Sequence, residues 1–351
     1  MNDAERENLY YIDVLKGMGI LMVIFGHASF HRYAAYFVYL FHMPLFFIIS
    51  GFLDRMKYAS LGEMLKKKSA RLLYPYIVFG ILIIVYNTFM DEIWGITTEG
   101  KLKKRVIALL YGNMIFEDNS SYIGVLWFLV CLFFAGVFAY GLWYLKKKSR
   151  LSMWMGILLL LIMGHVASYV KFQYEIRLPW CIDVAFVAAV FYLLGTVYRK
   201  WEKREQYETI FSGVVLLLIG ILLGILNMCY MKVNNYLDIR IDMLRMNYGI
   251  LPMFVLSAAA MTLGLMIILK KICEKHKFYI LARLGKMSLL LMVVHVYILQ
   301  MITLVLNLLG RYHWLLCFPV ALMLSILTAI IIERYLPFLF DYKRILKKET
   351  I

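Results

Sequence analysis

Residues 15–27 read LKGMGILMVIFGH, an apolar stretch in which Lys16 and His27 are the only ionisable residues. The surrounding apolar run, residues 12–30, is long enough for one α-helix to cross the hydrocarbon core of a bilayer. Eleven residues of α-helix advance about 16 Å and make about three full turns, so Lys16 and His27 lie on one face. An ionisable group at membrane depth costs several kcal/mol and usually faces a cavity or a partner.

Each of these two residues also has an ordinary explanation. Lys16 could extend its ammonium group to the lipid headgroups, and His27 could hydrogen-bond to a neighbouring helix. Their shared face favours a different interpretation, because Asp13 lies one turn before Lys16 on nearly the same stripe. The three side chains together indicate a polar channel that starts near one membrane surface and reaches His27.

The rest of the chain repeats the pattern of long apolar runs. Its 351 residues are 63% hydrophobic with a mean hydropathy of +0.75, whereas soluble proteins are about half apolar. We find no internal repeat and expect one membrane-embedded domain over residues 1–351, without a separate soluble domain. The sequence predicts an all-α, polytopic helical membrane bundle with ten transmembrane helices, at residues 12–30, 36–54, 72–90, 123–145, 151–169, 182–198, 209–230, 248–269, 287–308 and 314–333.

The distribution of basic residues predicts the orientation. A net charge of +16 could indicate nucleic acid binding, but the Lys and Arg residues cluster between the apolar runs. If both termini are cytoplasmic, the cytoplasmic segments hold 27 of the 38 Lys and Arg residues, as the positive-inside rule requires. We therefore predict cytoplasmic N- and C-termini in a multi-pass protein of a bacterial plasma membrane, with no nucleic acid partner. The acidic first eleven residues argue against a cleaved signal peptide.

Two further features concern segments outside the channel. Basic and apolar residues alternate over residues 61–73, 101–112 and 276–286, a pattern typical of amphipathic helices that anchor a protein to headgroups. The five cysteines form no CxxC pair and show no metal-ligand spacing. We interpret them as small core residues and predict no metal site.

Several stretches resemble the acyltransferase family 3 of membrane proteins. The opening YIDVLKGMGILMVIFGHAS is similar to the first helix of that family, in which an Arg or Lys precedes a His by eleven positions, as Lys16 precedes His27 here. Lys68-Ser-Ala-Arg71 stands where many members have two arginines, so this chain departs from the pattern at Lys68. The resemblance covers essentially the whole chain, and the other matching stretches are FHMPLFFIISGFL (41–53), LWFL (126–129), FYLLG (191–195) and GKMSLLLMVVH (285–295).

This resemblance implies an enzyme, a membrane O-acyltransferase. It implies transfer of an acyl group, most often acetyl, from cytosolic acyl-coenzyme A to a hydroxyl of a carbohydrate at the outer face. Acetyl-coenzyme A is then a donor substrate, and no cofactor is bound permanently. The expected partners are membrane lipid and a carbohydrate acceptor, either lipid-linked or a surface polysaccharide. The identity of the acceptor, the length of the acyl chain and the oligomeric state stay open.

The family motif suggests roles for four residues. Lys68 and Arg71, with Lys16, could hold the phosphates of coenzyme A, because arginine binds phosphate in bidentate fashion and lysine acts as a point charge. His27 would act as a general base on the acceptor hydroxyl, or it would carry the acyl group as an acyl-imidazole. Both roles require unprotonated imidazole, so activity should fall as the pH drops through the pKa of His27.

Other polar residues are candidates for the pore or the acceptor site, each with a structural alternative. His42 could instead be an interfacial residue, and His295 could bond a neighbouring helix. Asp183 could cap a helix N-terminus, and Trp127 could belong to the aromatic belt. Glu117 and Asp118 could orient a histidine or a sugar, although a solvated loop explains them more simply.

A transporter or flippase for a glycan precursor is the alternative function. Such a protein would use the same polar channel without acyl-transfer chemistry. It would not need a pair of cations, such as Lys68 and Arg71, facing the cytosol to hold a phosphate.

Overall fold

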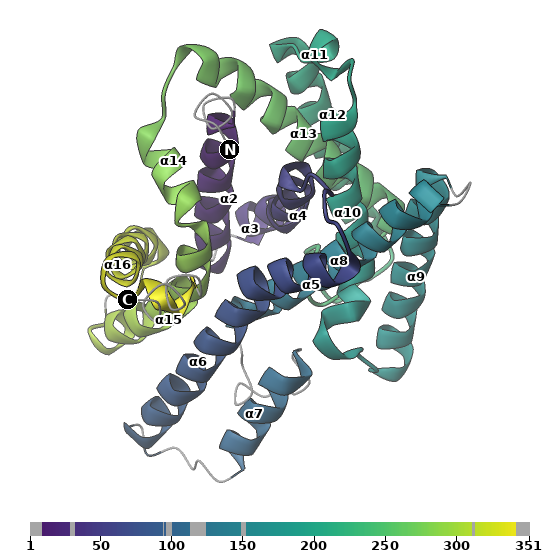
Figure 1. Cartoon of the computed structure of the whole chain (residues 1–351). Coiled ribbons are helices and arrows are strands. Elements are labelled where there is room, and N and C mark those ends of the chain that lie inside the picture. Colours follow the sequence, from purple (N-terminus) through teal and green to yellow (C-terminus); the bar gives the residue numbers. More distant parts are fainter. Residues whose placement is uncertain are drawn as a thin grey trace, which may run out of the picture. The chain divides into compact units, whose positions relative to one another are not determined.

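The computed structural model describes residues 9–28, 32–93, 95, 100–112, 124–148, 152–310 and 313–341. Over these ranges the chain is helical and contains no β-strand (Figure 1). The described residues include ten helical segments long and apolar enough to cross a membrane. The predicted all-α, polytopic membrane bundle is therefore confirmed, and the cytoplasmic orientation of the termini stays a prediction.

The chain divides into two compact units. The first combines Met1–Arg55 with Phe191–Ile330, and the second combines Met56–Val190 with Ile331–Ile351. The helices of the first unit are α2 (Tyr10–Ala28), α3 (Arg32–Tyr39), α4 (His42–Leu53), the second half of α10 (Ile182–Lys200), α11 (Arg204–Tyr207), α12 (Ile210–Val233), α13 (Leu251–Lys275), α14 (Tyr279–Lys286), α15 (Ser288–Leu308) and most of α16 (Trp314–Tyr335).

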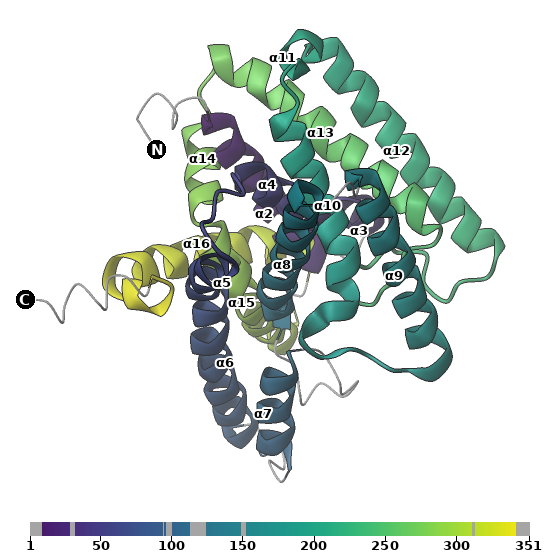
Figure 2. The same cartoon turned by 45° about the vertical axis from the view of Figure 1, so that its right-hand side comes forward.

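In the first unit, α14 lies directly against α2, and α12 lies beside α13 (Figures 1 and 2). Two glycines allow α14 and α2 to touch through their backbones. A Cβ atom on Gly17 would lie 2.0 Å from the carbonyl oxygen of Leu281, and one on Gly285 would lie 1.8 Å from that of Asp13. Small residues at such a crossing let membrane helices pack closely, where van der Waals contact rather than the hydrophobic effect holds them together.

A second glycine contact joins α4 to α10. A Cβ atom on Gly51 would lie 1.8 Å from the carbonyl oxygen of Tyr192, and one on Gly195 would lie 2.0 Å from that of Ile48. The Thr196 hydroxyl donates a hydrogen bond to the Gly51 carbonyl at 3.1 Å. The stretches FHMPLFFIISGFL and FYLLG therefore contain the residues at which α4 and α10 cross. This crossing fixes the position of α4 within the first unit.

The second unit contains the remaining elements. Arg105 of α7 donates to Asp91 of α6 at 2.6 Å, and the Tyr76 hydroxyl donates to the Leu109 carbonyl, so α6 and α7 pack together. The elements are α5 (Leu61–Lys68), the π-helix η1 (Ser69–Leu73), α6 (Tyr74–Ile93), α7 (Lys101–Tyr111), η3 (Gly124–Leu126), α8 (Trp127–Lys148), α9 (Met153–Tyr174), η4 (Pro179–Cys181), the first half of α10 and η5 (Pro337–Leu339).

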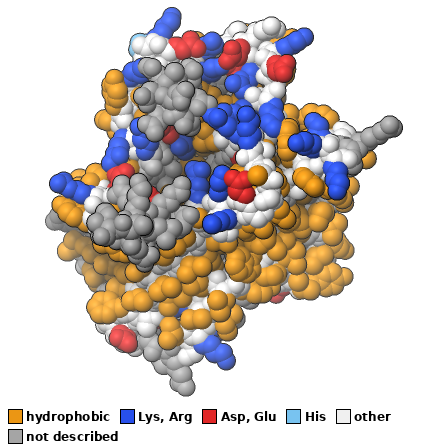
Figure 3. All heavy atoms as spheres, viewed as in Figure 1, with side chains coloured by type: hydrophobic (Ala, Val, Ile, Leu, Met, Phe, Trp, Pro, Cys, Tyr) orange, Lys and Arg blue, Asp and Glu red, His pale blue; other side chains and the backbone are white. Residues whose placement is uncertain are grey.

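Large apolar side chains are exposed along several of these helices, and Figure 3 shows broad hydrophobic areas on the visible face. Ile81, Val85 and Phe89 of α6 are all more than half exposed. A soluble protein rarely exposes contiguous apolar patches of this kind, so these faces fit lipid as their solvent. Four cysteines are buried, as predicted for core residues, and Cys229 is exposed.

Candidate functional site

His27 lies in the last turn of α2, which ends at Ala28. Its neighbours Val23, Ile24 and Ala28 are buried, whereas the His27 side chain is exposed. The imidazole therefore has free space around it, as a group that contacts a substrate must have. Lys16 lies in the other half of the same helix, about 16 Å away along the axis.

The three predicted site histidines, His27, His42 and His295, come together. The ring centroids of His27 and His295 are 5.2 Å apart, and Tyr39 lies 6.5 Å from His27. Tyr39 in turn contacts His42 edge to face, with 4.7 Å between the ring centroids. Because the four residues belong to α2, α3, α4 and α15, helices distant in sequence build this cluster. His42 and His295 are buried.

The tautomers of the two buried histidines follow from their hydrogen bonds. Nδ1 of His42 lies 2.8 Å from the Val38 carbonyl oxygen, and Nδ1 of His295 lies 3.0 Å from that of Leu291. A carbonyl oxygen can only accept, so in both rings we assign the proton to Nδ1. Nε2 of each neutral ring then carries a lone pair that can accept a hydrogen bond.

Arg240 and Asp242 extend the cluster, although they were not among the residues predicted from the sequence. The Arg240 guanidinium carbon lies 4.8 Å from the centroid of Tyr39. The charged side chains of Arg240 and Asp242 are both close enough to His27 to interact electrostatically with its imidazole. They come from the segment NNYLDIRIDML (234–244), whose polar residues between two apolar runs were the only available hint.

The segment that carries Arg240 is held in place by its own contacts. The Asn247 side chain donates to the carbonyl oxygens of Asp238 and Arg240, both at 2.8 Å. Ile241 and Met246 are fully buried. These contacts fix the backbone on both sides of Arg240, and its guanidinium group, which also pairs with Asp238 at 3.4 Å, lies over Tyr39.

Lys16 is paired within its own helix. Its ammonium nitrogen lies 2.7 Å from Oδ1 of Asp13, and both side chains are partly exposed. The predicted stripe of Asp13 and Lys16 is thus present as an ion pair. An ion pair at this exposure stabilises the fold by at most about 1 kcal/mol, so an anionic ligand can compete for the lysine.

Lys68 and Arg71 belong to the second unit. The Lys68 side chain runs over α8 at Gly136, where an added Cβ atom would lie 2.9 Å from its nitrogen. Arg71 is exposed and lies in the π-helix η1. A π-helical turn is uncommon and occurs often at functional sites, because it changes the direction of successive side chains.

Asp183 and Trp127 also belong to the second unit. Asp183 is buried at the start of α10, where Arg177 donates to it at 2.6 Å and the Leu178 amide at 3.2 Å. These bonds hold the turn that leads into the helix. Trp127 is the buried first residue of α8. Glu117 and Asp118 lie outside the described residues.

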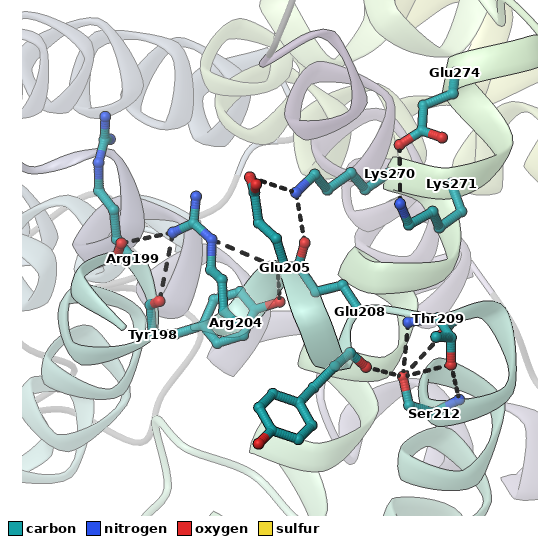
Figure 4. A network of polar contacts seen from close by, with 11 residues as sticks. Tyr198, Arg199, Arg204, Glu205, Glu208, Thr209, Ser212, Lys270, Lys271 and Glu274 are labelled. Atoms are coloured by element: carbon teal, nitrogen blue, oxygen red, sulfur yellow. Dashed lines mark hydrogen bonds and ion pairs between the residues drawn. The ribbon is translucent and has the colours of Figure 1, made fainter. Parts of the chain in front are cut away.

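A separate polar network joins the helix ends of the first unit near α11 (Figure 4). Glu208 is its centre: the Tyr198 hydroxyl donates to its carboxylate at 2.6 Å, Lys270 donates to the other oxygen, and Arg204 lies 3.5 Å away. Burial alone would raise the pKa of the Glu208 carboxyl, but Lys270, Tyr198 and Arg204 together hold that pKa below its usual value. The network ties α10 and α13 to the segment that leads from α11 into α12.

This network predicts a pH dependence of stability. The pKa of Glu208 is lower in the folded protein than in the unfolded chain, where it is about 4.5. The contribution of Glu208 to the free energy of unfolding is therefore complete above the pKa of the unfolded chain and is lost as the pH falls through the pKa of the folded protein. Glu208→Gln should lower the free energy of unfolding by about 2 kcal/mol at neutral pH. Below pH 4.5 the stability of this variant should fall less steeply with pH than that of the wild type. Thermal unfolding in detergent between pH 3.5 and 7 measures both effects.

Glu274→Gln is the matched control for that experiment. Glu274 is exposed and pairs only with Lys271, at 3.3 Å, among the partners recorded for the described residues. Its loss should change the free energy of unfolding by less than about 1 kcal/mol. Equal effects of the two substitutions would contradict the central role of Glu208.

The family model of an acyltransferase domain matches residues 9–334, nearly the whole chain. No curated protein and no solved structure matches the chain. The chain therefore belongs to the acyltransferase family 3 of membrane proteins.

Proposed function

We propose that the protein is a membrane O-acyltransferase that moves an acyl group, acetyl in the first instance, from cytosolic acyl-coenzyme A to a hydroxyl of an extracytoplasmic carbohydrate. The observation that carries this proposal is the exposed His27 within a cluster of two further histidines, in a chain of the acyltransferase family. Imidazole is the side chain best suited to accept a proton near neutral pH.

His27 acts in one of two ways. As a general base it takes the proton of the acceptor hydroxyl while the oxygen attacks the thioester carbonyl; the carbon–sulfur bond breaks, and the thiolate takes that proton. As an acyl carrier its nitrogen attacks first and the thiolate leaves; the acceptor oxygen then displaces the imidazole. Both routes consume one thioester and one hydroxyl, and both produce one ester and one thiol.

The donor's phosphates are held by basic side chains. Lys16 supplies one cation in the first unit, in the half of α2 remote from His27. We include Lys68 and Arg71 as phosphate-binding candidates on the ground of their charge and of the family motif. Arginine is suited to phosphate because its planar donors match two oxygens at once.

Substitution of these cations should weaken donor binding. Lys68→Ala and Arg71→Ala should each raise the Michaelis constant for acetyl-coenzyme A by about 10-fold or more, because a hydrogen bond to a charged group contributes about 1.5–3 kcal/mol. The turnover number should change little. Initial rates over a range of donor concentrations measure both constants.

Lys66→Ala is the control, since Lys66 is exposed on α5, the helix that also carries Lys68, and has no part in the proposed donor site. If Lys68→Ala and Arg71→Ala change only the yield or the membrane orientation of the protein, they do not hold the donor.

Reconstitution tests the function directly. Purified protein in liposomes, supplied with radiolabelled acetyl-coenzyme A, should hydrolyse the thioester slowly and should transfer acetyl when a glycan acceptor is added. Mass spectrometry of surface glycans from a deletion strain should show the loss of an acetyl group and so identify the acceptor. Movement of a glycan precursor across the bilayer without thioester turnover would favour the flippase.

A further inference from the structure

One ring nitrogen of His295 has no hydrogen-bond partner among the described residues. The side chain is fully buried on α15, and its Nδ1 is committed to the Leu291 carbonyl at 3.0 Å. Within the described part of the chain, Nε2 has no hydrogen-bond partner. Buried polar atoms are almost always paired, and leaving one unpaired costs about 1–3 kcal/mol. An atom kept in this state calls for a functional explanation.

The imidazole ring of His27 lies beside that of His295. The centroids of the two imidazoles are 5.2 Å apart and the ring planes are inclined by 57°. Two imidazoles joined by one N–H···N hydrogen bond have centroids about 5 Å apart, given a nitrogen–nitrogen distance near 2.9 Å. The separation already fits such a bond, and the exposed His27 ring has room to rotate into it.

The bond can form in one direction only. Because Nδ1 of His295 carries the proton, its Nε2 can accept but cannot donate while the ring is neutral. His27 must therefore supply the N–H. Its other nitrogen is then left with the lone pair, on the side of the ring away from His295.

We propose that His295 is a positioning residue for the acyl transfer: its Nε2 accepts the N–H of His27 and so fixes both the ring orientation and the tautomer of His27. This inference rests on the proposed function. The arrangement resembles in principle the way a second group orients the histidine of a catalytic triad. Here a neutral imidazole held by a backbone carbonyl does so.

The chemical consequence concerns the proton that moves. The free nitrogen of His27 takes the proton of the acceptor hydroxyl, the oxygen forms its bond to the thioester carbon, and the carbon–sulfur bond breaks. The thiolate then takes the proton from His27 and leaves as the thiol. Throughout, the N–H that faces His295 stays in place, and the lone pair of Nε2 stabilises the transient positive charge on His27.

Two conservative substitutions of His295 separate this role from simple packing. In His295→Asn the amide nitrogen takes the place of Nδ1, so the bond to Leu291 survives while the acceptor at Nε2 is lost. In His295→Gln the amide oxygen takes the place of Nε2. We expect His295→Asn to lower kcat about 100-fold with little change in the Michaelis constants, and His295→Gln to stay within about 10-fold of the wild type. Equal kcat values in the two variants would overturn the proposal.

A spectroscopic measurement tests the same bond without activity. The protein has seven histidines, so ¹⁵N-histidine labelling gives a resolvable set of ring signals, and His27→Ala identifies those of His27. We expect one neutral tautomer of His27 in the wild type and a mixture in His295→Asn. His165→Asn, a change at an exposed histidine of α9, should leave the His27 signals unchanged. A mixture already in the wild type would overturn the proposal. Absence of thioester turnover would instead defeat the proposed function.

Discussion

Replacing His27 with alanine should lower acyl transfer by about 10³-fold or more, because the reaction loses the group that accepts the proton or carries the acyl chain. The loss should appear in kcat rather than in the Michaelis constant for acetyl-coenzyme A. His27 is exposed in the last turn of α2, so its truncation leaves no cavity in the core. The measurement is radiolabelled transfer by purified protein, together with the unfolding temperature of the same sample.

Two further variants make this result decisive. His165→Ala removes an exposed histidine from the apolar helix α9 and should leave transfer at the wild-type level. His27→Gln keeps a hydrogen-bonding side chain of similar size but cannot accept a proton at neutral pH, so it should be as inactive as the alanine variant. Activity of His27→Gln within 10-fold of the wild type would exclude a chemical role for the imidazole.

The largest effect on stability is expected at Gly51. Gly51→Ala would place a Cβ atom 1.8 Å from the Tyr192 carbonyl oxygen, so α4 and α10 must move apart. Overpacking of a tight contact typically costs about 1–3 kcal/mol, and we expect about 3 kcal/mol here because backbone cannot rotate away as a side chain can. The Thr196 hydrogen bond to the Gly51 carbonyl should be lost as well. Thermal unfolding in detergent, followed by size-exclusion chromatography, measures the change.

Gly141→Ala provides the comparison within a membrane helix. Gly141 lies in α8, and beyond its chain neighbours and the adjacent backbone of its own helix no described atom comes within 4 Å of the position of its added Cβ. Alanine is favoured over glycine in a helix by about 1 kcal/mol, so this variant should be at least as stable as the wild type. If Gly51→Ala and Gly141→Ala unfold at the same temperature, close contact between α4 and α10 does not limit the stability of the protein.

The helical spans were predictable from composition and length. In lipid every backbone amide and carbonyl must be paired within the chain, so an apolar run of about 20 residues has the helix as its simplest solution. The run at residues 36–54 shows the limit of this argument. It forms two helices, α3 and α4, that meet between Tyr39 and His42, and His42 and Pro44 are the residues in the run that mark this break.

The candidate site was predictable only in part. Lys16 and His27 share one helix, so the helical repeat alone places them on one face. His295 could be recognised as a polar residue at membrane depth, but its distance from His27 depends on how α15 packs against α2. Arg240 was missed because it lies in a connecting segment without periodicity, where side-chain position follows from contacts such as those of Asn247.

The number and length of the membrane helices thus follow from local hydrophobicity, because transfer into lipid is an additive property of each segment. The cluster of His27, His42 and His295 does not follow in this way. It depends on which helices touch and through which residues, as at Gly17 and Gly285, and such contacts are a property of the folded unit as a whole. Backbone carbonyls of the neighbouring turns then decide which nitrogen of each buried ring stays free.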